Sequence, residues 1–207
     1  MVLRVVLSTA IVLAAMLPVA GQRSKSTSKR STKIKPIRVT VVVKSDTPWP
    51  VQPKETDPWS GFVLEEDRLA LLFPGTAKDL STDVEGGVKT YALSTARAMY
   101  MLAVRDIGEF VDPREIDTYL DGRILAAFGQ PTVKFVEKQE ISYAGRSARH
   151  LVVIDKGKRM STRIYVLNGK LFITLVSINT KDYSLEFEKW IVKFLNSFSV
   201  GVRSPKA

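Results

Sequence analysis

Two apolar segments in the C-terminal half of the chain, 161–167 and 170–178, are separated by Asn168 and Gly169. Both turn residues accept a positive φ, which a two-residue type I′ hairpin turn requires. The pattern predicts an antiparallel hairpin with apolar residues on both faces, so both faces need a cover. The predicted pairs are Leu167 with Lys170, Val166 with Leu171, Tyr165 with Phe172, Ile164 with Ile173 and Arg163 with Thr174.

Alternating apolar and polar residues predict further strands before this hairpin, while two segments change to a helical period. The first helix is expected within 110–129, with Asp112 as its N-cap, and the second over 184–197, with Asp182 or Ser184 as its N-cap. The sequence therefore predicts an α+β fold, an α/β/α sandwich with one central antiparallel sheet and two amphipathic helices on opposite faces. The expected strands are 61–64, 68–73, 79–84, 88–95, 98–105, 133–143, 146–154, 159–167 and 170–178.

Residues 1–21 combine a basic Arg4, an apolar stretch and small residues at the end, which is the pattern of a secretory signal peptide. The apolar stretch is shorter than the ~20 residues that a spanning helix needs, although an uncleaved anchor is the alternative. We expect the mature protein to be exported, periplasmic or extracellular, without a transmembrane segment once the signal is cleaved.

Residues 22–58 are rich in Ser, Thr, Lys, Arg and later Pro, a composition that predicts a disordered basic tail and linker. Seven basic residues up to Arg38, together with Arg4, supply eight of the ten net positive charges. An anionic envelope surface fits such a tail better than nucleic acid, and a solvated spacer is the alternative. The run 39–43 is either an edge strand or unstructured. The residues expected to act electrostatically are Arg23, Lys25, Lys29, Arg30, Lys33 and Lys35.

The folded domain is expected over 59–200, with a short C-terminal tail at 201–207. Several of its motifs resemble those of bacterial secreted domains related to the PsbP-like fold, which is named for the lumenal extrinsic protein of photosystem II. Members of that group are non-catalytic binding or assembly factors of membrane complexes, so the resemblance implies a binding role and no particular site residue. The motifs are Trp59-x-x-Phe62, Leu71-Leu72-Phe73-Pro74-Gly75-Thr76, Ile141-x-x-x-Gly145-Arg146, Arg163-x-Tyr165, Gly169-Lys170-Leu171-Phe172 and Trp190-x-x-x-Phe194-x-x-Ser197-Phe198.

The chain has no cysteine and a single histidine, His150, so thiol chemistry is excluded and familiar metal or nucleophile motifs are missing. No cofactor, metal site or catalytic residue is predicted. We therefore expect an exported, non-enzymatic module that binds an envelope protein or an anionic envelope surface, of unknown oligomeric state. The alternative is a small hydrolase or ligand-binding enzyme with an unrecognised site.

One polar cluster follows from the predicted register. A turn at Lys156 and Gly157 pairs His150 with Arg163, and the next hairpin pairs Arg163 with Thr174, so the three residues form a row beside Tyr165. A buried guanidinium needs a partner. The expectation is an internal salt bridge to Asp117, Asp121 or Glu188, and the alternatives are a bound anion or partner carboxylate and a solvent-exposed row.

Overall fold

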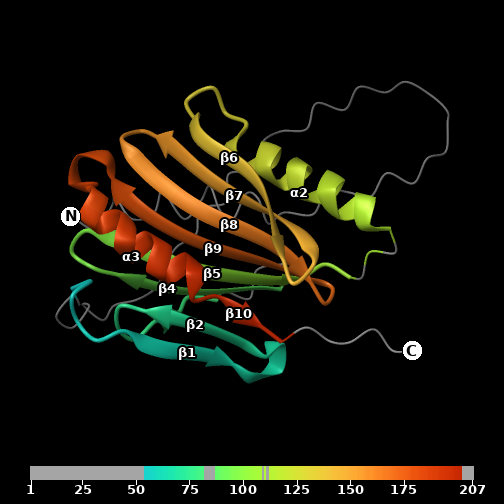
Figure 1. Cartoon of the computed structure of the whole chain (residues 1–207), viewed down its shortest axis with the longest axis horizontal. Coiled ribbons are helices and arrows are strands. Elements are labelled where there is room, and N and C mark those ends of the chain that lie inside the picture. Colours follow the sequence, from blue (N-terminus) through green and yellow to red (C-terminus); the bar gives the residue numbers. More distant parts are fainter. Residues whose placement is uncertain (1–53, 82–86, 109, 111, 202–207) are drawn as a thin grey trace.

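The computed structural model describes residues 54–81, 87–108, 110 and 112–201. The signal peptide and nearly all of the basic tail predicted above lie outside these residues. Within them, seven strands form one antiparallel sheet in the order β3-β4-β5-β9-β8-β7-β6 (Figure 1). These strands are β3 (Lys78–Asp79), β4 (Val88–Ser94), β5 (Ala98–Asp106), β6 (Lys134–Tyr143), β7 (Arg146–Asp155), β8 (Lys158–Leu167) and β9 (Lys170–Asn179).

Three shorter strands form a second antiparallel sheet in the order β1-β2-β10. They are β1 (Ser60–Leu64), β2 (Leu69–Phe73) and β10 (Ser199–Val200), with the 3₁₀ turn η2 (Glu65–Asp67) between the first two. The α+β class is therefore correct, but the expectation of a single central sheet is wrong. The two-residue strand β10 follows the last helix and carries too little pattern to be recognised in the sequence.

Both helices lie where the sequence places them. Helix α2 (Pro113–Phe128) begins after Asp112, whose side chain accepts a hydrogen bond of 2.8 Å from the backbone N–H of Arg114. Helix α3 (Leu185–Asn196) follows the 3₁₀ turn η3 (Thr180–Asp182), and Ser184 is its N-cap, accepting from the N–H of Phe187 at 3.1 Å. Of the two expected caps, Ser184 is the one used.

The predicted hairpin register is confirmed in full: all five expected pairs between β8 and β9 are formed around Asn168 and Gly169. Both turn residues have positive φ, 51° and 73°, as a type I′ turn requires. The turn at Lys156 and Gly157 has the same signs of φ and fixes the β7–β8 register.

Alternate residues of the central strands belong to two separate apolar clusters, as strand geometry dictates. On β9, Leu171 and Ile173 pack with Leu120 of α2, whereas Phe172 and Val176 pack in the cluster that contains buried residues of α3 and of β2. In Figure 1, α3 crosses the front of the large sheet, and the small sheet lies below it. The hairpin that is apolar on both faces therefore receives the two covers that its sequence demands.

Candidate functional site

The register brings the four predicted site residues together. His150 pairs with Arg163, Arg163 pairs with Thr174, and Tyr165 lies two positions along β8 on the same face. This face is the one covered by α3, because Arg163 Nη1 donates to the backbone carbonyl of Leu195 at 3.2 Å. Tyr165 stacks on Phe198, directly after α3, with ring centroids 4.3 Å apart.

Arg163 has no carboxylate within 4.0 Å among the described residues, so the expected internal salt bridge is wrong. Asp117 and Asp121 contact Arg149 on the opposite face of the sheet instead. The positive charge of Arg163 is opposed by the carbonyl of Leu195, which belongs to the negative end of the α3 dipole. Its Nε is buried and has no hydrogen-bond partner among the described residues.

Two buried hydroxyl groups lie beside Arg163 on this face. Thr174 is 0% exposed and Ser161 is 1% exposed. Among the described residues, the Ser161 side-chain oxygen has no hydrogen-bond partner, whereas the Thr174 side chain interacts with the Tyr165 hydroxyl. Thr174 is directly opposite Arg163, and Ser161 is two residues before it on β8. Because Ser161 Oγ is bonded to no base, it is not arranged as an activated nucleophile.

His150 lies at the more exposed end of the row. Its Nε2 is 3.8 Å from Glu137 Oε1 on β6, and the imidazole also interacts with the backbone of Thr162. Burial and, next, the positive charge of Arg163 lower the pKa of His150 below its ordinary value of 6.5, against the opposing effect of Glu137 and Glu188. The imidazole is therefore neutral at pH 7.

Together these groups form what we call the α3-side row: His150, Ser161, Arg163, Tyr165 and Thr174. It offers hydrogen-bond donors around the positive charge of Arg163, which is paired with no carboxylate among the described residues. Such an arrangement suits a negatively charged acceptor, above all a carboxylate, because charge-assisted hydrogen bonds to arginine are the strong ones.

The sequence interpretation missed the buried ion-pair cluster on the other face. Arg149 is 1% exposed, and its Nη2 lies 2.9 Å from Asp117 Oδ1 while its Nε lies 3.4 Å from Asp121 Oδ1. Burial alone would lower the pKa of Arg149, but Asp121 and Asp117 outweigh it and raise the pKa. A usable signal existed, because Arg149 alternates with buried Leu151 on β7, and two acids four residues apart share one face of a helix.

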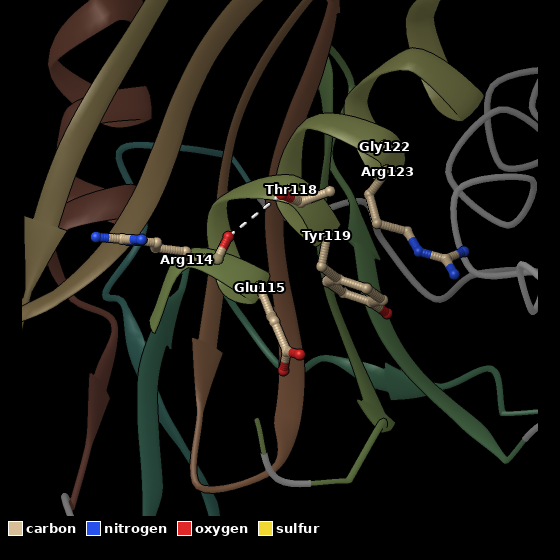
Figure 2. Close-up of a pocket in the computed structure, with 6 residues that line it drawn as sticks. All are labelled: Arg114, Glu115, Thr118, Tyr119, Gly122 and Arg123. Atoms are coloured by element: carbon tan, nitrogen blue, oxygen red, sulfur yellow. Dashed lines mark hydrogen bonds between the residues drawn. The ribbon is translucent and has the colours of Figure 1, made fainter. Parts of the chain in front are cut away.

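A cavity of about 520 Å³ lies along one stripe of α2. Figure 2 shows that the polar side chains there diverge: Arg114 and Arg123 point to opposite sides of the helix, and Glu115 points along a third direction. The Arg123 guanidinium instead lies 4.9 Å from the centre of the Tyr119 ring. Since no set of polar groups converges on this cavity, we do not assign the site to it. The lining residues are Arg114, Glu115, Thr118, Tyr119, Gly122 and Arg123.

The acidic turn at 65–67 is only partly exposed to solvent. Glu66 is paired with Lys89 at the surface, but the side chain of Asp67 is buried and paired with Lys170. Within the described ranges, no group of three or more His, Asp or Glu side chains is placed to hold a metal ion. Nor does any helix in those ranges have the length and apolar character needed to cross a membrane.

The fold is similar to folds seen in solved structures. CyanoP, the cyanobacterial PsbP from Synechocystis sp. PCC 6803, superposes with a TM-score of 0.51 at 12% identity, over 69% of this chain and 92% of that one. The chain has a PsbP-like fold. At this identity the PsbP-like likeness concerns the fold alone.

Two further structures are similar at lower scores. The Ran-binding protein Mog1p of Saccharomyces cerevisiae has a TM-score of 0.44 at 9% identity, over 70% of this chain and 96% of that one. A protein of unknown function, PA94 from Pseudomonas aeruginosa, described as a putative regulator, has a TM-score of 0.42 at 15% identity, over 72% and 99%. No family model and no curated protein matches the sequence.

Proposed function

We propose that this protein is an exported, non-catalytic binding module of the bacterial cell envelope, and that its α3-side row holds a carboxylate of a partner protein. The single observation behind the proposal is the environment of the Arg163 side chain. Its guanidinium is partly buried, its Nε has no partner, and no carboxylate among the described residues neutralises it. A positive charge left in that state is costly unless a ligand completes it.

The neighbours of Arg163 support a carboxylate as that ligand. The hydroxyl group of Ser161 is buried beside it and has no hydrogen-bond partner among the described residues, so it can donate one hydrogen bond to a carboxylate oxygen. Glu137 and Glu188 lie near His150 at the outer end of the row. They disfavour a highly charged anion such as phosphate more strongly than a single carboxylate.

The N-terminal segments complete the proposal. Residues 1–21 direct export, and the basic residues from Arg23 to Lys35 bring the protein to an anionic envelope surface, where the folded domain meets its partner. Attraction of this kind is long-ranged and screened by salt, whereas the contact at Arg163 is local. The two contributions can therefore be separated experimentally.

The test uses His150 as a reporter, because it is the single histidine of the chain and gives one set of imidazole NMR signals. Acetate, then an acidic peptide, is titrated into the purified protein at constant pH and ionic strength. We expect a saturating shift of the His150 signals in the wild type and none in Arg163→Met. Arg146→Met, at the exposed start of β7, is the matched control and should respond as the wild type does.

Affinity capture from the protein's own cells, with and without residues 22–58, then identifies the partner. A partner retained equally by the wild type and by Arg163→Met would contradict the proposed site. An acetate shift that never saturates, or that Arg163→Met preserves, would show adventitious ion binding only and would overturn the carboxylate assignment.

A further inference from the structure

Strand β6 forms one edge of the large sheet, on the side opposite the small sheet (Figure 1). It is ten residues long, most of them are exposed, and no described strand pairs with its outer side. Helix α2 packs on β7 and β8, and it contacts β6 through the Phe128–Phe135 and Asp121–Lys138 pairs on one face of the sheet. A long strand edge is a template for pairing with another strand.

The first residues of β6 are not suited to such pairing. A β-bulge interrupts the register with β7 between Phe135 and Glu137, and bulges bend a strand and disrupt its ladder. From Glu137 onward the pairing with β7 is regular, up to Tyr143. Any added strand must therefore use the segment 137–143.

The two faces of this segment are known from its contacts. Lys138 and Glu140 point to the α2 side, where they lie 3.6 Å from Asp121 and 3.7 Å from Arg149. Gln139 lies opposite His150, and Ile141 packs in the α3-side cluster, so both point to the other side. The Lys138 and Glu140 side chains remain 50% and 80% exposed, so both charges are available to a second chain.

We infer that β6 pairs with β6 of a second copy of this chain, antiparallel about a two-fold axis through Gln139. A two-fold axis pairs residues whose numbers have a constant sum and whose side chains share a face. An axis through Glu137, Lys138 or Glu140 sets that charge against its own copy. An axis through Ile141 forms no pair of opposite charges.

The axis through Gln139 avoids both problems. It places Lys138 opposite Glu140 of the second copy, and the symmetry repeats the pair, while Glu137 meets Ile141 and the two neutral Gln139 side chains meet each other. This self-complementary charge pattern favours a second copy of the chain as the partner, and it favours the register with the axis through Gln139. The two seven-stranded sheets then continue into one another.

Only about five residues per chain pair in this register, so the interface is smaller than the standard size and we expect a dissociation constant on the order of 100 µM. Sedimentation equilibrium of the purified protein, from micromolar to millimolar concentration at physiological ionic strength, measures it. Lys138→Glu alone, or Glu140→Lys alone, replaces both attractive pairs by repulsive ones and should weaken dimerisation at least about tenfold.

The double variant Lys138→Glu/Glu140→Lys decides the matter. It restores opposite charges across the axis, so dimerisation should return, although each substitution also opposes Asp121 or Arg149 within its own chain. Circular dichroism melts show whether each variant is folded. A wild type that is monomeric at millimolar concentration, or a double variant that dimerises no better than the single variants, would overturn the inference.

Discussion

Arg149 and Arg163 lie on neighbouring strands of the same sheet, yet the structure gives them opposite environments. Arg149 is buried against α2 and contacts Asp117 and Asp121. Arg163 faces α3 and donates to a backbone carbonyl, and within the described part of the chain no carboxylate pairs with it. The same side chain therefore stabilises the fold at one position and is available to a ligand at the other.

Replacing Arg149 should reveal its structural role. Arg149→Met keeps most of the apolar stem but removes the cation beside Asp117 and leaves Asp121 paired with Lys138 alone, so we expect a loss of roughly 1–2 kcal/mol in the free energy of unfolding. The loss is limited because both acids are about half exposed. Arg163→Met is the matched control and should be neutral or slightly stabilising. The midpoints of unfolding in urea measure the stability of both variants. Equal losses of stability would mean that Arg163 also has a structural role.

His150 makes the stability of the fold depend on pH. Its pKa is below 6.5 in the folded protein because of burial and Arg163, so the unfolded chain binds more protons as the pH falls below 6.5. The free energy of unfolding should therefore decrease between about pH 7 and about pH 5.5, a window in which ordinary carboxyl groups remain ionised.

His150→Gln removes this titration and should flatten the curve over the same window. No other histidine can substitute for it, since the chain has one. Thermal denaturation in a series of buffers makes the comparison. Parallel curves for the wild type and His150→Gln would show that another group controls the acid response.

At the scale of elements, three of the hairpins share one turn geometry. The first turn residue has positive φ in each case: 50° at Ala144, 48° at Lys156 and 51° at Asn168, and a glycine with positive φ follows each. The three turns differ in how well their first residue tolerates this conformation. Asparagine accepts it readily, whereas alanine and lysine do not.

Exchanging these first residues should change stability in a predictable direction. Ala144→Asn should raise the free energy of unfolding by roughly 0.5–1 kcal/mol, because it relieves the cost of positive φ. Asn168→Ala should lower it by about 1 kcal/mol, since it also removes the 3.2 Å hydrogen bond from Asn168 Nδ2 to the carbonyl of Gly201. The midpoints of unfolding in guanidinium chloride measure the stability of both variants. A lower midpoint for Ala144→Asn than for the wild type would contradict the prediction.

The hairpins were predictable because Gly residues and alternating side chains fix their register locally, so the row of His150, Arg163 and Thr174 followed correctly. The position of α3 over that row was not predictable from the sequence. Whether Arg163 meets an acid or a carbonyl depends on how α3 is placed along the sheet, and the sequence of the helix does not specify that placement. The expectation of a salt bridge failed at this step.

For the whole molecule, the second sheet is the main feature that the sequence does not show. It joins β10, from the C-terminal end of the domain, to β2 near its beginning, and Leu72 N–H also donates to Ser197 Oγ at 3.0 Å. Contacts between segments so far apart in the chain leave no local periodicity. These contacts hold β10, after the last helix, against β2, near the start of the described residues.

The N-terminal limit of the resistant domain can be tested with trypsin. Glu55 is buried, accepts a hydrogen bond from Thr95 Oγ1, and receives the Trp59 indole N–H on its carbonyl at 3.0 Å. We therefore expect trypsin to cleave at basic residues up to Lys54 and to leave a fragment that starts at Glu55, while the bonds after lysine and arginine in β5 to β9 stay protected. Mass spectrometry of a digestion time course identifies the fragment. Cleavage after the lysines and arginines of β5, α2 and β6 to β9 as fast as cleavage before Glu55 would contradict this limit, because those bonds lie in the sheet or in the helix that packs on it.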